Sequence, residues 1–163
     1  MKKTTLLVGV TLLAAALEAG ALPDYKVLCD KIGDIPGWTM SQCEGMKMTN
    51  PMMGDVVTAT KSYTKGDATI ETTVVSGMQA MMMWGPYSTG TEVENDEALV
   101  KIEKVDNFTV GISYDKQERS GGIVVQLAPN AVLAVNFENL DWKDALEMVK
   151  KLDWKDLAEQ FTQ

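Results

Sequence analysis

The sequence contains no histidine, and that absence excludes more chemistry than any other feature of its composition. Histidine is the usual general base near neutral pH, the base in Ser-His-Asp and Cys-His arrangements, and the commonest metal ligand in proteins. The chain also lacks a G-x-S-x-G elbow, a P-loop and a D-x-D-x-D-G calcium loop. We therefore expect no catalytic activity and predict no catalytic residue.

Positive charge is scarce as well. The 163 residues include 15 Lys and Arg against 23 Asp and Glu, which gives a net charge of −8, and Arg119 is the single arginine. An acidic chain is repelled by phosphate backbones, so nucleic acid is not an expected partner, and anionic membrane surfaces are disfavoured for the same reason. A phosphate or carboxylate clamp built from several arginines is excluded too.

A long apolar run occurs only at the N-terminus, where the features of a signal peptide are found together. Lys2 and Lys3 precede the uncharged run 4–17, and Ala19-Gly20-Ala21 has the small-x-small pattern of a cleavage site. The run is too short to span a bilayer, and no second run of about 18 apolar residues follows, so we expect no stable membrane anchor. The sequence predicts a cleaved signal peptide, residues 1–21, and one domain, residues 22–163, in a periplasmic or secreted protein.

Cysteine occurs only twice, at Cys29 and Cys43. In an exported protein an even number of cysteines favours a disulfide, and closing a loop of this length stabilises a fold by roughly 3 kcal/mol. A redox-active pair of thiols is the alternative, but the spacing is not C-x-x-C. We predict a structural Cys29–Cys43 disulfide, which leaves no thiolate for catalysis or for zinc.

Periodicity and turn signals predict both helices and strands. Asp24 is a candidate N-cap for a short helix that ends at Gly33, and residues 55–64 and 68–76 form a hairpin around a Lys-Gly-Asp turn. The repeat L-D-W-K-D, at 140–144 and again at 152–156, predicts two short helices capped by aspartates. The other predicted elements are a strand at 38–44, a methionine-rich loop or irregular edge at 45–54, a short helix at 77–84, and strands at 98–105, 108–114, 122–128 and 132–137.

The order of these elements determines the expected fold class. The strands follow one another through short polar connections, which favour antiparallel neighbours, and there is no alternation of strand and helix. We therefore expect an α+β fold, with an antiparallel sheet of about six or seven strands and helices packed on one face.

Methionine is in excess. Ten methionines follow the predicted signal peptide, and nine of them fall within residues 40–83. Three interpretations compete: flexible filler of an irregular core, an adaptable apolar surface for a hydrophobic ligand or partner protein, and a Cu(I) site made of thioethers. The candidate binding residues are Met46, Met48, Met52, Met53, Met78, Met81, Met82 and Trp84.

The Cu(I) alternative depends on spacing. Met46 and Met48 are two residues apart, which places both sulfur atoms on the same side of an extended strand. Met52 or Met81 could add a third soft ligand, and Trp84 could cap the site by a cation–π contact. Periplasmic copper chaperones are similar in using methionine pairs with a tryptophan, although they usually add a histidine, which this chain lacks.

The overall pattern resembles that of small exported bacterial proteins of unknown function. The matching features are a short helix followed by Ile35-Pro36-Gly37-Trp38, the strand that contains Tyr63, the methionine-rich helix, later strands, and the ending Asp153-Trp154-Lys155-Asp156-Leu157-Ala158. The layout is also similar to the PsbP/Mog1 fold, a resemblance that implies a sheet with helices and assigns no catalytic residue.

These observations favour a non-catalytic binding or accessory protein that uses a methionine-rich apolar surface and needs no cofactor. Its expected partner is a hydrophobic ligand or another protein. The first alternative is a protein that binds Cu(I) through Met46, Met48, Met52 and Met81. The second alternative is a hydrolase that uses some of the scattered carboxylates.

Overall fold

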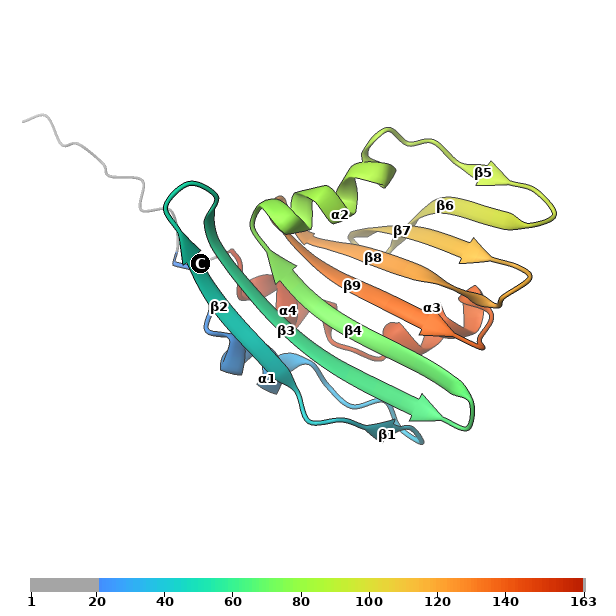
Figure 1. Cartoon of the computed structure of the whole chain (residues 1–163), viewed down its shortest axis with the longest axis horizontal. Helices are drawn as coiled ribbons and strands as arrows, with labels where there is room; N and C mark the ends of the chain where they lie inside the picture. The colour runs from blue at the N-terminus through green and yellow to red at the C-terminus, as the bar shows by residue number, and fades with distance from the viewer. Residues whose placement is uncertain (1–20, 163) are drawn as a thin grey trace, which may run out of the picture.

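The computed structural model describes residues 21–162, which form one sheet with four helices (Figure 1). Apart from Ala21, the predicted signal peptide lies outside the described residues. The helices are α1 (Tyr25–Lys31), α2 (Met78–Ser88), α3 (Trp142–Val149) and α4 (Trp154–Glu159). The strands are β1 (Thr39–Met40), β2 (Glu44–Asn50), β3 (Gly54–Lys65), β4 (Ala68–Ser76), β5 (Val93–Glu94), β6 (Ala98–Val105), β7 (Phe108–Asp115), β8 (Ser120–Ala128) and β9 (Ala131–Glu138).

The sheet is antiparallel throughout. Its strand order is β1-β3-β4-β9-β8-β7-β6-β5, and β2 pairs with β3 along the same edge as β1. The β4–β9 pair joins the strands that precede α2 to the strands that follow it. This confirms the predicted antiparallel arrangement of a mixed helix and strand domain, but the sheet has nine strands rather than six or seven. The additional strands are the two-residue β5 and β2, which occupies the segment predicted as a loop or irregular edge.

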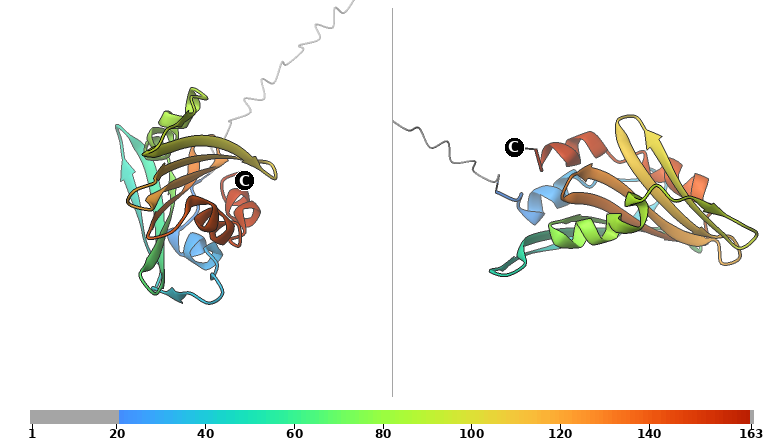
Figure 2. Two further views of the ribbon diagram at one scale, coloured as in Figure 1. Left: turned by 90° about the vertical axis from the view of Figure 1, so that its right-hand side faces the viewer. Right: turned by 90° about the horizontal axis from the view of Figure 1, so that it is seen from above.

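One face of the sheet forms the main hydrophobic core with α1, α3 and α4. Its strand side chains alternate along each strand, as in Leu133, Val135 and Phe137 of β9, all of which are buried. Leu28 of α1 and Leu157 of α4 are fully buried in the same core. The three helices therefore cover one side of the sheet, as Figure 2 shows.

Helix α2 lies on the opposite face, so the prediction that the helices pack on one face is wrong (Figure 2). Val132 and Ala134 alternate with the main-core residues of β9 and pack in a second cluster with Ala80 and Tyr87 of α2. The physical reason is that the central strands carry consecutive apolar residues, such as Val74-Val75 in β4. That pattern is typical of strands buried on both faces.

Aspartates begin three of the helices, as the sequence predicts. Asp24, Asp141 and Asp153 each accept a hydrogen bond from a backbone N–H two or three residues later, at 2.8 to 2.9 Å. A cap of this kind stabilises a helix by about 1 kcal/mol. The second and third caps start α3 and α4, and the indole N–H of Trp154 donates to the carbonyl of Val149 at 2.9 Å. The local repeat therefore forms two capped helices that are linked to each other.

A disulfide attaches α1 to the edge of the sheet. Cys29 and Cys43 are bonded, with their Cα atoms 5.6 Å apart, as predicted. The hydroxyl of Tyr63 donates a hydrogen bond to the carbonyl of Gly33 at 2.6 Å, which holds the segment after α1 against β3. Burial raises the pKa of Tyr63 to about 12. Since Cys43 directly precedes β2, the disulfide ties the start of the strand that carries Met46 and Met48 to α1.

Candidate methionine-lined site

Strand β2 places two methionines on the α2 side of the sheet. In the β2–β3 register, Met46 lies opposite Thr58 and Met48 lies opposite Val56. Residues directly opposite each other in an antiparallel pair share a face. Val57, which alternates with Val56, belongs to the main core on the other face. The side chains of Met46 and Met48 therefore both point away from the main core, and both are exposed.

The β2–β3 turn is built by Asn50. Its side-chain oxygen accepts hydrogen bonds from the backbone N–H groups of Met52 and Met53, at 2.8 and 3.1 Å. Gly54 follows with a φ of 79°, a conformation that favours glycine. Asn50 and Pro51 thus form a tight turn. The segment 45–54, predicted as a loop or irregular edge, is therefore most of strand β2 followed by this turn.

Helix α2 is anchored at both ends. Gly77 has a φ of 85°, and a Cβ there would lie 2.8 Å from the carbonyl oxygen of Asp55, so glycine permits the helix to begin this close to β3. At the other end, the ring of Tyr87 lies over Gly111, and its hydroxyl is 2.7 Å from that of Ser113. Burial raises the pKa of Tyr87. The two anchors hold one side of α2 against the sheet and leave the other side in solvent.

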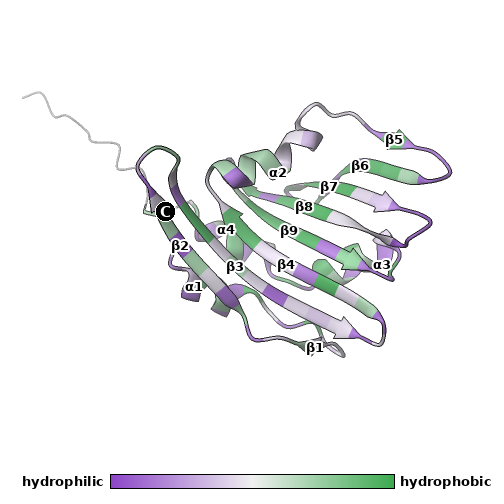
Figure 3. Ribbon diagram, viewed as in Figure 1, coloured by the Kyte–Doolittle hydropathy of each residue, from purple (hydrophilic) through white to green (hydrophobic). Residues whose placement is uncertain are grey.

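The outer side of α2 is uncharged and largely apolar even though it is exposed. Met78, Met81 and Met82 are all exposed, whereas Ala80 is buried beneath them. The helix carries no charged residue along its length. Its ribbon in Figure 3 is mostly green or pale, with one hydrophilic band near its start. A solvent-facing helix surface is ordinarily polar or charged, so this surface departs from the usual amphipathic pattern.

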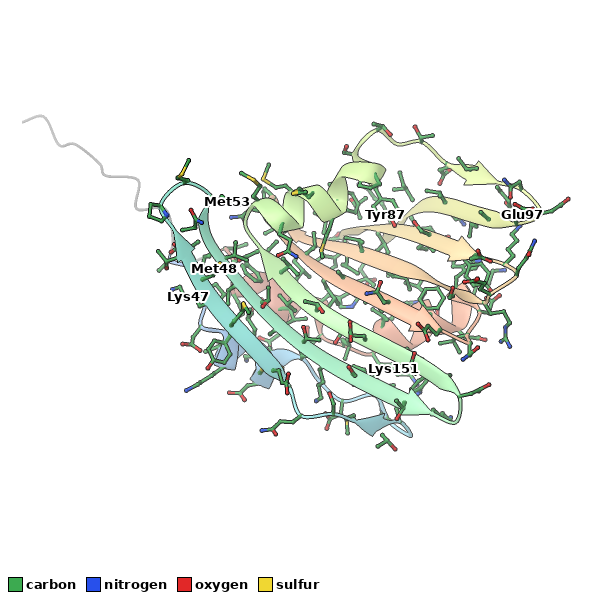
Figure 4. All side chains as sticks on the ribbon, in the orientation of Figure 1. Lys47, Met48, Met53, Tyr87, Glu97 and Lys151 are labelled. Atoms are coloured by element: carbon green, nitrogen blue, oxygen red, sulfur yellow. A yellow bond between two sulfur atoms is a disulfide. The ribbon has the colours of Figure 1, made fainter. Side chains whose placement is uncertain are left out.

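A groove of about 360 Å³ lies between β2, the β2–β3 turn and the start of α2. Sulfur atoms gather at this end of the molecule, where Met48 and Met53 are labelled (Figure 4). None of the lining residues is charged. The lining consists of Met48, Asn50, Met53, Gly54, Val56, Met78, Gln79 and Met82.

The groove methionines are open to solvent. The exposed fractions are 51% for Met48, 56% for Met53, 47% for Met78 and 71% for Met82. Methionine is unbranched and has three rotatable side-chain bonds, so such side chains can rearrange around a bound group. The groove is therefore an uncharged, deformable surface made largely of thioether and hydrocarbon.

The remaining predicted site residues do not line the groove. Met46 follows the same face of β2, Met52 is 94% exposed at the turn, and Met81 is exposed on α2. Trp84 is partly buried in the second cluster, with its ring centroid 5.6 Å from that of Tyr87. Of the four methionines predicted to bind Cu(I), which are Met46, Met48, Met52 and Met81, only Met48 lines the groove.

Sequence reasoning missed four lining residues: Asn50, Gly54, Val56 and Gln79. Val56 could have been found from the predicted strand at 55–64. Side chains alternate between the two faces of a strand, and the buried face begins at Val57, so Val56 lies on the other face. No such signal marks Asn50 or Gln79, because their positions depend on the pairing of β2 with β3 and on the placement of α2.

The interpretation of methionine as core filler is wrong for this region. Eight of the nine methionines within residues 40–83 are exposed, by 39% to 94% of their surface. Only Met83 is partly buried, against the second cluster. The physical reason is that branched and aromatic side chains already fill both sides of the sheet. The methionines therefore form a surface.

The acidic side chains of residues 21–162 all retain contact with solvent. The buried polar side chains there are Thr72 and Ser76, both hydrogen-bonded, and no Asp or Glu is buried. In the same residues, no group of three or more His, Cys, Asp or Glu is placed to hold a metal ion. Ser62 and Lys65 have the S-x-x-K spacing of a serine nucleophile and its lysine partner. They are three residues apart along β3, so their side chains lie on opposite faces of the strand.

Two larger hollows elsewhere are lined by charges of both signs. One of about 650 Å³ lies between the β6–β7 turn and the α3–α4 connection, where Lys150 and Lys155 accompany Asp106 and Asp153. Another, of about 540 Å³, is lined by residues that include lysines and glutamates of β6 and α3. Because both lysines and acidic residues line each of these two hollows, neither favours a ligand of one charge. The groove differs from both in having no charged lining residue.

Comparison with family models finds no match, and neither a curated protein sequence nor a solved structure matches the chain. Within residues 21–162, no helix combines the length and the hydropathy needed to cross a membrane.

Proposed function

We propose that this protein is a non-catalytic binding or accessory protein whose methionine-lined groove holds an uncharged, apolar segment of a partner protein. The observation that carries the proposal is the exposure of eight methionines, four of which line one uncharged groove. Contiguous exposed apolar surface of this kind typically marks an interaction site. Methionine suits such a surface because its flexible side chain can repack around different apolar partners.

The edge of the sheet beside the groove supports a peptide as the occupant. Strand β2 pairs with β3, and no other strand of residues 21–162 covers its outer edge. An extended segment can add to such an edge through main-chain hydrogen bonds and place alternate side chains on either face. One of these faces carries Met46 and Met48. Because the groove lining carries no charge, a charged segment would lose hydration there without gaining an ion pair, so the lining favours an uncharged segment.

The expected affinity is modest. Fully burying a methionine side chain stabilises a complex by about 1.5–3 kcal/mol, so covering the exposed half of each groove methionine contributes roughly 1 kcal/mol. The entropy lost on association offsets much of that total. We therefore propose reversible binding, as an accessory protein requires.

The disulfide supports the proposal that the protein acts in the periplasm or is secreted. Disulfides persist in oxidising compartments and are rare in the reducing cytosol. Cys29 and Cys43 are bonded, and the predicted signal peptide supplies the route of export. N-terminal sequencing of the protein recovered from its native host tests this part of the proposal, with Leu22 as the expected first residue.

The binding proposal is tested with a fluorescent, uncharged, leucine-rich peptide as the probe. Met48→Lys combined with Met82→Lys places two charges in the groove. Met40→Lys combined with Met52→Lys adds the same charges at exposed methionines outside it. Because an apolar segment cannot bury a lysine charge without cost, we expect the groove variant to lose about tenfold or more in affinity, which is about 1.4 kcal/mol, while the control changes little.

Fluorescence anisotropy measures both variants against the unchanged protein. Equal losses in the two variants, or no binding by the unchanged protein, would contradict the proposal. Much tighter binding of a fatty acid, with displacement of the peptide, would instead assign the groove to a small hydrophobic ligand.

A further inference from the structure

The groove brings together thioether sulfur atoms from three separate elements. Met48 comes from β2, Met53 from the β2–β3 turn, and Met78 and Met82 from α2. We propose that these four methionines form a binding site for Cu(I). This is a second activity that goes beyond the binding of apolar segments, because a metal uses the sulfur lone pairs whereas a partner protein uses the hydrocarbon surface.

The ligand chemistry selects a soft cation. Thioethers are neutral, soft ligands that prefer Cu(I), whereas Mg²⁺ and Ca²⁺ prefer oxygen and Zn²⁺ prefers imidazole, thiolate or carboxylate. The other polar side chains of the groove are the amides of Asn50 and Gln79. The oxygen of Asn50 already accepts two backbone hydrogen bonds in the β2–β3 turn. A hard divalent cation therefore finds no suitable set of ligands in the groove.

The soft ligands that compete with the groove are other exposed thioethers, such as those of Met46, Met52 and Met81. The chain contains no histidine, and Cys29 and Cys43 are bonded to each other, so no thiolate is available. Four neutral thioethers would leave a bound Cu(I) with its single positive charge. The net charge of −8 provides a favourable long-range field for that cation.

The backbone around the site is fixed while the ligand side chains are mobile. Asn50 holds the β2–β3 turn, and Gly77 holds the first turn of α2 against β3. Met78 and Met82 are four residues apart on α2, a spacing that puts their Cβ atoms about 5–6 Å apart on one face. The unbranched side chains leave the sulfur atoms free to turn towards one ion.

This site differs from the one predicted by spacing alone. The sequence predicts Met46, Met48, Met52 and Met81 as ligands, whereas the groove replaces three of these with Met53, Met78 and Met82. The difference supplies a matched pair of variants. Met48→Leu with Met78→Leu removes two groove thioethers, and Met52→Leu with Met81→Leu removes two exposed thioethers outside the groove.

Cu(I) affinity is measured on the exported protein with its disulfide intact, without oxygen, by competition with the chromogenic chelator bicinchoninate and with ascorbate as the reductant. Ag(I), which is soft and does not change oxidation state, is titrated in parallel while the methionine methyl resonances are followed by NMR. We expect one ion per chain, at least a tenfold loss of affinity in the groove variant, and less than a twofold change in the control. The methyl resonances that shift should be those of the groove methionines.

Three results would overturn the copper proposal: no transfer of Cu(I) from the chelator to the unchanged protein, an equal loss of affinity in both variants, or equally tight binding of Zn(II). The variants also separate copper binding from apolar binding, because leucine keeps the hydrocarbon surface and removes the sulfur. The groove leucine variant should therefore lose more affinity for Cu(I) than for the leucine-rich peptide, and the control variant outside the groove should keep both affinities. Each activity can therefore fail without the other, and circular dichroism of each variant confirms that it is folded.

Discussion

Gly111→Ala tests how α2 is held in place. Gly111 lies in β7, directly under the ring of Tyr87, which anchors the C-terminal end of α2. An alanine Cβ at this position would lie 2.3 to 2.5 Å from three ring atoms of Tyr87. Unstrained carbon contacts are about 3.5–4.0 Å, so the ring must move away by roughly 1 Å or more.

The expected cost has two parts. Overpacking a well-filled site destabilises a protein by about 1–3 kcal/mol. A displaced ring also loses its hydrogen bond with Ser113, now 2.7 Å long, which contributes about 1 kcal/mol. We therefore expect the free energy of unfolding to fall by about 2–4 kcal/mol. Because α2 supplies Met78 and Met82, the affinity of the groove should fall too.

A double-mutant cycle in urea unfolding, followed by tryptophan fluorescence, isolates the contact. Tyr87→Ala alone should be strongly destabilising, since truncating a large buried aromatic costs about 3–5 kcal/mol. In that background the added methyl group of Gly111→Ala has room, so its cost should drop to about 0.5 kcal/mol or less. An equal cost of Gly111→Ala in both backgrounds would refute the reasoning.

Gly122→Ala is the matched control. Its Cβ would meet the nearest atom, the carbonyl oxygen of Val135, at 3.5 Å, an ordinary contact. We expect this substitution to leave the free energy of unfolding unchanged or to raise it by about 0.4–1 kcal/mol, because alanine restricts the unfolded chain. A loss as large as that of Gly111→Ala would show that any strand glycine in this sheet is intolerant.

Three further predictions follow from the same structure. Replacing both Cys29 and Cys43 by serine should lower the free energy of unfolding by roughly 3 kcal/mol in urea, and an unchanged value would mean that the bridge does not stabilise the fold. Because burial raises the pKa of Tyr63 to about 12, the folded state holds that proton more tightly than the unfolded chain, whose tyrosine pKa is about 10. The stability that this proton contributes is therefore complete below pH 10 and is lost as the pH rises towards 12; Tyr63→Phe should flatten this fall in pH-dependent unfolding, and an identical profile would refute the assignment. Hydrogen peroxide should oxidise the eight exposed methionines within residues 40–83 before Met83 and Met148, which are partly buried, and peptide mass spectrometry showing equal rates would contradict the exposures.

The strands and caps were predictable because they depend on local patterns. The hairpin of β3 and β4, the strands from β6 to β9 and the aspartate caps of α1, α3 and α4 all follow alternation, turn residues or capping chemistry within a few residues. Strand β2 was missed because methionine has no strong strand preference and Asn50-Pro51 favours a break. Its pairing with β3 satisfies the backbone, which no short sequence window shows. The resemblance to the PsbP/Mog1 fold stays a prediction.

The composition of the site was predictable but its geometry was not. An excess of methionine marked the segments 46–53 and 78–84, and all four groove methionines lie within them. Which of these methionines meet depends on the β2–β3 register and on Gly77 starting α2 beside Asp55. Both are contacts between residues distant in sequence. The placement of α2 on the second face did have a signal, the consecutive apolar residues Ile123-Val124-Val125 of β8.

The covalent link from α1 ends at Cys43, the residue directly before the strand that supplies Met48. Without that link, β2 is still attached by its ladder to β3 and by the packing of Gly45 against Tyr25. With the disulfide reduced, the edge of the sheet at β2 would therefore be held less firmly than in the oxidised protein. For the proposed exported protein, disulfide formation after translocation would attach the start of β2 to α1, and with it the strand that supplies Met48 to the proposed groove.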